Sequence, residues 1–189
     1  MHIWIDIDNL KHIPLAKAVL AELKQRGHSV TVTCEDEDKL KKELKNQDII
    51  AQDVGVIVWF FGLFKQEIVM VRGLNLEKYI KPRNIDAAFS LGSLPMTYAC
   101  FSNGNIPLIL LLEKLEPKPD FVNLVIERGF FIVPEDIHDQ TILEQGYDLN
   151  KIGKYKGSLN MTNPELKPVK EIVNQIEILS YRISKKLET

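Results

Sequence analysis

The chain has few cysteines and no excess of positive charge, and both features exclude specialised classes of protein. Its 189 residues include only two cysteines, Cys34 and Cys100, which lie far apart in apolar segments. We therefore expect two reduced, buried thiols rather than a disulfide or a cysteine-ligated metal site. The net charge of −2 provides no basic surface for nucleic acid, so we expect no nucleic-acid partner.

Long hydrophobic runs and cofactor motifs are also absent from the sequence. The longest apolar runs, VGVIVWFFGLF and NIPLILLLE, are too short to span a bilayer, and no secretory signal follows Met1. We therefore expect no integral membrane segment and a cytoplasmic protein. The sequence contains no GxGxxG, P-loop, GxSxG or HExxH motif. It accordingly predicts no cofactor and no metal site.

Short apolar segments alternate with helical segments along most of the chain. The first unit is a strand over residues 3–7, a helix with Pro14 in its first turn that ends at Gly27, and a strand over residues 29–34. Further strands are predicted over residues 54–61, 85–90, 106–112, 130–133 and 151–156. Further helices are predicted over residues 36–45, 63–80, 95–103 and 121–128, with a helix or turn over 135–145. This alternation predicts a doubly wound, Rossmann-like parallel sheet in a three-layer α/β/α arrangement.

The last part of the chain differs from this pattern. After NMTNPELKP, apolar residues recur at helical spacing and form one stripe on a long amphipathic helix; they are Val169, Ile172, Val173, Ile176, Leu179, Ile183 and Leu187. We divide the chain into a Rossmann-like domain over residues 1–160 and a linker with a C-terminal helix over residues 161–189. The stripe either packs on the sheet of its own domain or binds a partner.

The polar turn between the first strand and the first helix is the best candidate for a functional site. It contains Asp6, Asp8, Asn9 and His12. In a parallel α/β sheet such a turn lies at the carboxyl edge of the strands, where ligands bind. Asp8 and Asn9 also have a structural use, because their side chains can cap turns. His12 is either a hydrogen-bonding residue, an acid or base, or part of an anion site at the helix N-terminus.

Later strands contribute more polar residues to the same edge. Gly92 and Ser93 open a predicted helix, where they form either a tight turn or a site for a phosphate or carboxylate group. Glu113 follows the next predicted strand. Other polar residues at strand ends are Glu35, Ser90, Lys114, Glu116, Glu135 and Lys156.

The opening motif also carries a resemblance to a known family. IWIDIDNLKHIP, a helix ending in LKQRGH and the strand VTVTCED resemble an uncharacterised prokaryotic family of glycosyltransferase-B-like proteins, a domain of unknown function with the signature WIDxxNxPH, RGH and TARD. FSLGS, NIPLILLLE, FFIVPE and KYKG follow in the family's order, so the likeness spans about residues 1–160. Lys11 stands where the family has Pro, and Leu91 stands where a His is common.

This resemblance implies one half of a two-domain fold. In glycosyltransferase-B proteins two Rossmann-like domains face a cleft; the N-terminal domain holds the acceptor and the C-terminal domain binds the sugar nucleotide. The chain matches the N-terminal half only. The resemblance therefore implies a domain that binds a sugar, a lipid-linked sugar or a partner subunit rather than one that catalyses a reaction alone. The partner would be a donor-domain subunit, or a second copy bound through the C-terminal helix. The ligand-binding candidates on family-like positions are Asp6, Asp8, Asn9, His12, Gly92, Ser93 and Glu113.

Two other functions stay open at this point. Asp6-Ile7-Asp8 after an apolar strand resembles the D-x-D of haloacid-dehalogenase-like phosphatases, which implies a Mg²⁺-dependent phosphohydrolase or nuclease using Asp6 and Asp8. A non-catalytic interaction domain is the third hypothesis, and it applies if the polar residues at the carboxyl edge only bond to one another. Whether the chain is an enzyme is therefore left undecided by the sequence.

Overall fold

A parallel sheet of seven strands forms the centre of the molecule, in the order β3-β2-β1-β4-β5-β6-β7. The computed structural model describes residues 1–55, 65–102, 106–115 and 128–187. Within them the strands are β1 His2–Ile7, β2 Ser29–Cys34, β3 Gln52–Asp53, β4 Ala87–Ser90, β5 Leu108–Leu111, β6 Phe130–Pro134 and β7 Ile152–Tyr155. The strand order reverses between β1 and β4, so the loops that follow these two strands lie next to each other at the carboxyl edge.

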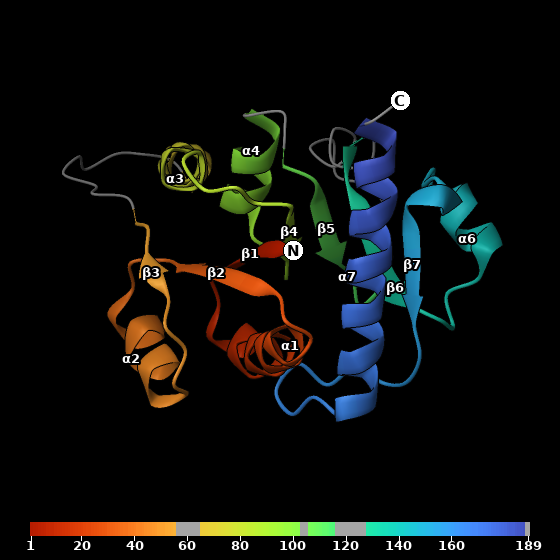
Figure 1. Cartoon of the computed structure of the whole chain (residues 1–189), viewed down its shortest axis with the longest axis horizontal. Coiled ribbons are helices and arrows are strands. Elements are labelled where there is room, and N and C mark those ends of the chain that lie inside the picture. Colours follow the sequence, from red (N-terminus) through yellow and green to blue (C-terminus); the bar gives the residue numbers. More distant parts are fainter. Residues whose placement is uncertain (56–64, 103–105, 116–127, 188–189) are drawn as a thin grey trace.

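Helices cover both faces of the sheet, which confirms the doubly wound three-layer prediction. They are α1 Ile13–Gln25, α2 Asp38–Asn46, α3 Lys65–Ile80, α4 Leu94–Ser102, α6 Asp139–Glu144 and α7 Leu166–Leu187, with short 3₁₀ turns η1 Leu10–His12 and η2 Leu149–Lys151. The buried side chains of α1, α2 and α7 pack on one face, and those of α3, α4 and α6 on the other. Figure 1 shows α3 and α4 on the opposite side of β1 and β2 from α1 and α2.

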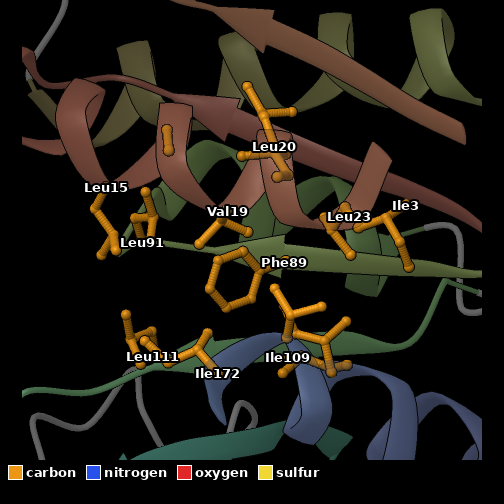
Figure 2. Close-up of a cluster of buried hydrophobic side chains, with 14 of the residues drawn as sticks. Ile3, Leu15, Val19, Leu20, Leu23, Phe89, Leu91, Ile109, Leu111 and Ile172 are labelled. Atoms are coloured by element: carbon orange, nitrogen blue, oxygen red, sulfur yellow. The ribbon is translucent and has the colours of Figure 1, made fainter. Parts of the chain in front are cut away.

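The first strand shows how the sequence produces these layers. Ile3, Ile5 and Ile7 point to the α1 and α7 side, while Trp4 packs on the other face, because successive side chains of a strand alternate. Both faces are covered by helices, so the strand is apolar on both sides from Ile3 to Ile5, and Asp6 near its carboxyl end is the buried exception. Figure 2 shows Phe89 of β4 between the side chains of α1 and Ile172 of α7.

Two predicted segments differ from the structure or lie outside the described residues. The strand expected over 54–61 is present only as β3, which lies just before it, and residues 56–64 are not described. Val54 still continues the ladder, since its N–H donates to the carbonyl oxygen of Cys34. Of the helix expected over 121–128, residues 121–127 are also not described.

The apolar stripe of α7 packs inside the molecule. Ile172, Ile176 and Leu179 are fully buried in the same cluster as α1 and the sheet. Gly153 of β7 allows this close approach, because a Cβ there would lie 2.6 Å from Oε1 of Gln175. The stripe is therefore used by the chain itself, and only the outer face of α7 is left for a partner. No helix in the described ranges is long and apolar enough to cross a membrane.

Candidate functional site

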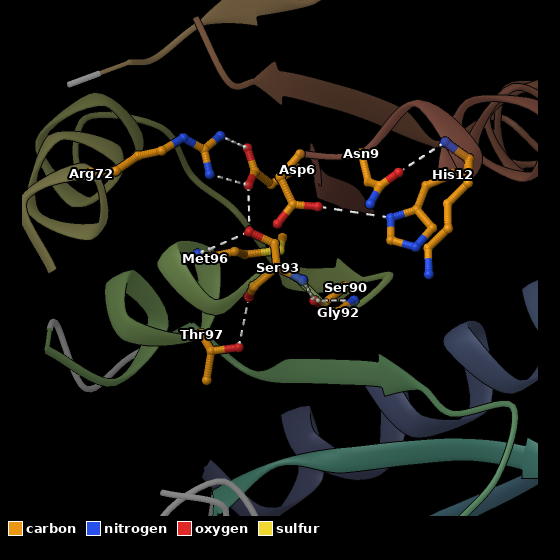
Figure 3. A network of polar contacts seen from close by, with 11 residues as sticks. Asp6, Asn9, His12, Arg72, Ser90, Gly92, Ser93, Met96 and Thr97 are labelled. Carbon is orange, nitrogen blue, oxygen red and sulfur yellow. Dashed lines mark hydrogen bonds and ion pairs between the residues drawn. The ribbon is translucent and has the colours of Figure 1, made fainter. Parts of the chain in front are cut away.

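Asp6 lies at the carboxyl end of β1 and is the centre of a buried polar network. Its carboxylate receives two hydrogen bonds from the guanidinium of Arg72 on α3, at 2.8 and 2.9 Å. Thr33 Oγ1 donates to one carboxylate oxygen at 2.7 Å, and Ser93 Oγ donates to the other at 2.6 Å. Asp6 and Arg72 are each only 1% exposed. Figure 3 shows this network, with Arg72 and Ser93 facing the carboxylate from different elements.

The geometry of Asp6 gives it a structural role. Each carboxylate oxygen already accepts two hydrogen bonds, which uses its ordinary acceptor capacity. Burial alone would lower the pKa of Arg72, but the charge and hydrogen bonds of Asp6 outweigh it and raise that pKa. Arg72 also donates from Nε to the carbonyl oxygen of Val54 at 2.9 Å. The pair thus joins β1, the segment after β3 and α3, and neither partner reaches the surface.

Gly92 and Ser93 form a turn that is capped from within. The hydroxyl of Ser90 accepts hydrogen bonds from the N–H groups of Gly92 and Ser93, both at 3.1 Å. Ser93 Oγ in turn accepts from the N–H of Met96 at 3.3 Å, which caps the N-terminus of α4. Gly92 has a φ of +110°, a conformation that favours glycine. These two N–H groups are used inside the turn, as a tight turn requires.

Asp8, Asn9 and His12 lie beside this turn, at the entrance to α1. Asn9 Oδ1 accepts from the N–H of Lys11 at 3.0 Å, so Asn9 has the predicted capping role. His12 is 7% exposed, and its Nδ1 lies 3.7 Å from Oδ1 of Asp8. That nitrogen has no hydrogen-bond partner, although it is buried. A buried ring nitrogen without a hydrogen-bond partner is unusual in proteins, and here the carboxylate of Asp8 lies just beyond hydrogen-bond distance.

Glu35 brings a further carboxyl group to the region after β2. Burial raises its pKa; Arg72 opposes this rise, and the negative charge of Asp8 adds to it. Glu35, Asp8 and Asp6 therefore all lie within electrostatic reach of Arg72. In the described part of the chain, however, no group of three or more His, Cys, Asp or Glu side chains could hold a metal ion.

Glu113 lies in a different part of the same edge. It lines a pocket of about 620 Å³ between the loops that follow β5, β6 and β7. The other lining residues are Pro134, Glu135, Asp136, Tyr155, Gly157, Ser158 and Leu159. The structure thus brings Asp6, Asp8, Asn9, His12, Gly92 and Ser93 into one region after β1 and β4, and places Glu113 in this pocket.

Two important residues were missed by reasoning from the sequence. Arg72 lies on the apolar stripe of α3, four residues after Ile68 and four before Leu76, and a charge in that position signals a buried partner. Tyr155 lies in the last predicted strand, and its aromatic ring gave no signal of a pocket. Asp6, the partner of Arg72, and Glu113, which lines the pocket with Tyr155, are distant from them in sequence, so only the fold could identify these neighbours.

Comparison with known proteins agrees with the fold. A family model described as "Protein of unknown function (DUF354)" matches residues 1–186. No curated protein sequence matches the chain. A UDP-GlcNAc 2-epimerase from Neisseria meningitidis bound to UDP-GlcNAc is similar with a TM-score of 0.68 and 14% identity, over 99% of this chain and 52% of that chain.

Two other solved structures are also similar in fold to this chain over less than half of their own length. A glycosyltransferase from Rickettsia africae ESF-5 has a TM-score of 0.60 and 15% identity, over 84% of this chain and 43% of its own. MurG of Acinetobacter baumannii has a TM-score of 0.54 and 18% identity, over 73% of this chain and 41% of its own. The chain thus spans about half the length of the structures it resembles. At these identities the likeness concerns the fold alone.

Proposed function

The chain belongs to the DUF354 family, and we propose that it forms one wall of a glycosyltransferase-B-type cleft and binds a carbohydrate group at the carboxyl edge of its sheet. One observation carries the proposal: nearly the whole chain resembles about half of an epimerase bound to a sugar nucleotide. In open α/β sheets ligands bind outside the carboxyl ends of the strands, where the strand order reverses. In this chain that point lies between β1 and β4.

His12 is the residue that we assign to the ligand. Its ring is buried next to Asp8, which can hold a proton on Nδ1 when the two approach more closely. The other ring nitrogen, Nε2, has no hydrogen bond within the described chain and can accept one from a sugar hydroxyl. An Asp–His pair of this kind can also take a proton from that hydroxyl. Asn9, Asp8 and Gly92 border the same place.

The charge of the edge favours a sugar over a phosphate group. Asp8 and Glu35 lie at one end of it, and Glu113, Glu135 and Asp136 surround the pocket at the other end. Carboxylates accept hydrogen bonds from hydroxyl groups, whereas they repel the charges of a nucleotide diphosphate. The edge therefore suits the acceptor side of a cleft, in which a separate domain or subunit binds the nucleotide.

Exposed leucines at the same edge favour contact with a second domain or subunit. Leu10, Leu94 and Leu166 are 42%, 46% and 63% exposed, and each lies in the segment that follows the carboxyl end of a strand. Apolar side chains among polar ones are typical of a surface that packs against another domain or subunit. We assign this edge, rather than the buried stripe of α7, to the contact with a donor-domain subunit.

The two alternatives from the sequence have less support. A phosphohydrolase of the D-x-D type needs a free carboxylate at Asp6, but Arg72 holds that group from within the protein. A pure interaction domain would have its polar edge fully bonded internally. Nε2 of His12, which has no hydrogen bond within the described chain, argues against that arrangement.

A titration followed by ¹H–¹⁵N NMR tests the proposal. We expect N-acetylglucosamine to shift the amide signals of residues 8–12 and 91–93 in a saturable way. UDP-N-acetylglucosamine should bind no more tightly, because the acidic edge gains nothing from the diphosphate.

A pair of variants locates the binding. His12→Gln should weaken the binding of N-acetylglucosamine about tenfold, the effect of one lost hydrogen bond to a buried polar group. His2→Gln, at the opposite end of β1, should leave it unchanged. No saturable shift at the carboxyl edge with either ligand, or equal effects of the two variants, would overturn the proposal.

A further inference from the structure

The pocket between the loops after β5, β6 and β7 has a buried phenol among its lining residues. Tyr155 is only 2% exposed, and it lines the pocket together with Pro134. Its hydroxyl makes no hydrogen bond with any residue in the described ranges, and it is not one of the described atoms that are both buried and unpartnered, so it stays accessible at the pocket. The hydroxyl of Tyr155 is therefore available for a hydrogen bond to a ligand in the pocket.

The Tyr155 hydroxyl stays protonated at any physiological pH. Burial, together with the negative charges of Glu113 and Asp136, raises the pKa of Tyr155 to about 12. The group can thus both donate and accept a hydrogen bond. This suits a hydroxylated ligand and gives no advantage to an anion.

The rim of the pocket is strongly acidic. Glu113, Glu135 and Asp136 all line it. Within the described chain the side chains of Glu113 and Asp136 form no ion pair and no hydrogen bond. Lys156 lies 3.7 Å from Glu135, but both side chains are more than half exposed, so solvent screens that pair. The described lining of the pocket therefore contains these three carboxylates and no cation, together with the neutral phenol of Tyr155.

We propose that this pocket, which we call the Tyr155 pocket, binds a hydroxylated ligand with a protonated primary amine, of which an amino sugar with a free amino group is the representative. The ammonium group lies between the carboxylates of Glu113 and Asp136, and a ligand hydroxyl bonds to Tyr155. The volume of about 620 Å³ accommodates a monosaccharide with room to spare. This inference rests on the proposed function. It adds that the bound sugar carries a positive charge on a protonated amino group.

Three matched ligands test the inference by ¹H–¹⁵N NMR titration below the pKa of the amine. Glucosamine is cationic, N-acetylglucosamine is neutral, and glucosamine 6-phosphate carries an added anion. We expect glucosamine to bind about tenfold more tightly than N-acetylglucosamine, as one charge-assisted hydrogen bond would provide. The 6-phosphate should bind more weakly than glucosamine. The shifted signals should belong to residues 113, 135–136 and 155–159, and added salt should reduce the preference.

Variants separate the charge from the phenol. Asp136→Asn should remove most of the preference for glucosamine and leave the affinity for N-acetylglucosamine unchanged. Tyr155→Phe keeps the size of the side chain and should weaken the binding of both glucosamine and N-acetylglucosamine. Asp38→Asn, a change of the same type at a fully exposed position on α2, serves as the control and should alter neither.

The outcomes distinguish this inference from the proposed function. Equal affinities for glucosamine and N-acetylglucosamine, or a preference that survives Asp136→Asn, would overturn the amine site while sugar binding at the edge still stands. Binding of glucosamine in the Tyr155 pocket without any effect of N-acetylglucosamine at residues 8–12 would support the amine site and overturn the proposed function. Absence of binding by all three ligands would overturn both.

Discussion

At the scale of single residues, the most consequential contact is the ion pair between Asp6 and Arg72. The two residues are 66 positions apart in the chain, and the pair holds α3 against the carboxyl end of β1. Moving two charges out of water is costly, and only good geometry and additional hydrogen bonds compensate for it. Asp6 has both, since Thr33 and Ser93 complete its shell. The carboxylate that looked like a catalytic group is thus a support for the neighbouring turn.

Removing the cation of this pair should be strongly destabilising. Arg72→Met leaves a buried carboxylate without its countercharge, and we expect a loss of about 3–5 kcal/mol in the free energy of unfolding. Lys78→Met, an exposed change on the same helix, should cost less than about 0.5 kcal/mol. Denaturation by urea, followed by circular dichroism, measures both. Similar losses in the two variants would contradict the structural role of the pair.

At the scale of elements, α7 is attached to α1 by a small polar cluster as well as by its apolar stripe. Glu177 of α7 accepts a hydrogen bond from Arg26 at 2.8 Å and one from His28 at 2.7 Å. Burial alone would raise the pKa of Glu177, but these hydrogen bonds and the charges of Arg26 and His28 outweigh it and lower the pKa. The cluster therefore joins the last helix to the end of the first.

This cluster makes the docking of α7 sensitive to acid. The pKa of Glu177 is lower in the folded state than in the unfolded state, so its stabilising contribution is present above the unfolded pKa, about 4.3, and is lost as the pH falls through the folded pKa. Glu177→Gln should cost about 1 kcal/mol at neutral pH and less at acidic pH.

Glu171→Gln, on the same helix, is the matched control for this prediction. Unfolding midpoints in urea, measured from neutral to acidic pH, should converge for wild type and Glu177→Gln but stay parallel for wild type and Glu171→Gln. A constant difference between wild type and Glu177→Gln over the whole range would contradict the assigned role.

At the scale of the whole molecule, the C-terminal segment completes the core that the Rossmann-like part begins. The stripe residues of α7 from Val169 to Ile183 share one buried cluster with β1, β4, β5 and β6. Five of them, Val169, Ile172, Val173, Ile176 and Leu179, are fully buried. Burial of an aliphatic side chain contributes about 1.5–3 kcal/mol, so the stripe contributes on the order of 10 kcal/mol, as much as the net stability of a typical domain.

A chain that ends at residue 160 should therefore not fold cooperatively. We expect it to lose the sharp unfolding transition and to bind a hydrophobic dye, because the face of the sheet under α7 would be exposed to water. Ile178→Ser, on the outer face of the same helix, should leave the transition within about 0.5 kcal/mol of wild type. A cooperative transition in the shortened chain would show that α7 is an appendage rather than a part of the core.

Much of the fold could be predicted from the sequence because its signals are local. The alternation in β1, Pro14 at the start of α1 and Gly27 after its end mark elements that form as expected. The third strand was less predictable. The apolar run that begins at Val54 predicted a strand over residues 54–61, whereas β3 pairs with β2 through Gln52 and Asp53. The polar residues of the candidate site were predicted to lie at the carboxyl edge, and their ligand-binding roles stay predictions.

The sequence by itself determined the parallel α/β architecture, the amphipathic α7 and the collection of polar residues at the carboxyl edge, because each depends on spacing within one element or on the general position of loops in such a sheet. Only the tertiary structure decided which of these residues bond within the protein. Arg72 reaches Asp6 from another layer and pairs with it inside the protein, while packing leaves Nδ1 of His12 without a partner and brings Tyr155 to the pocket that Glu113 and Asp136 also line. Such pairings join residues that are far apart in the chain, and burial and charge compensation, which no local pattern encodes, select them.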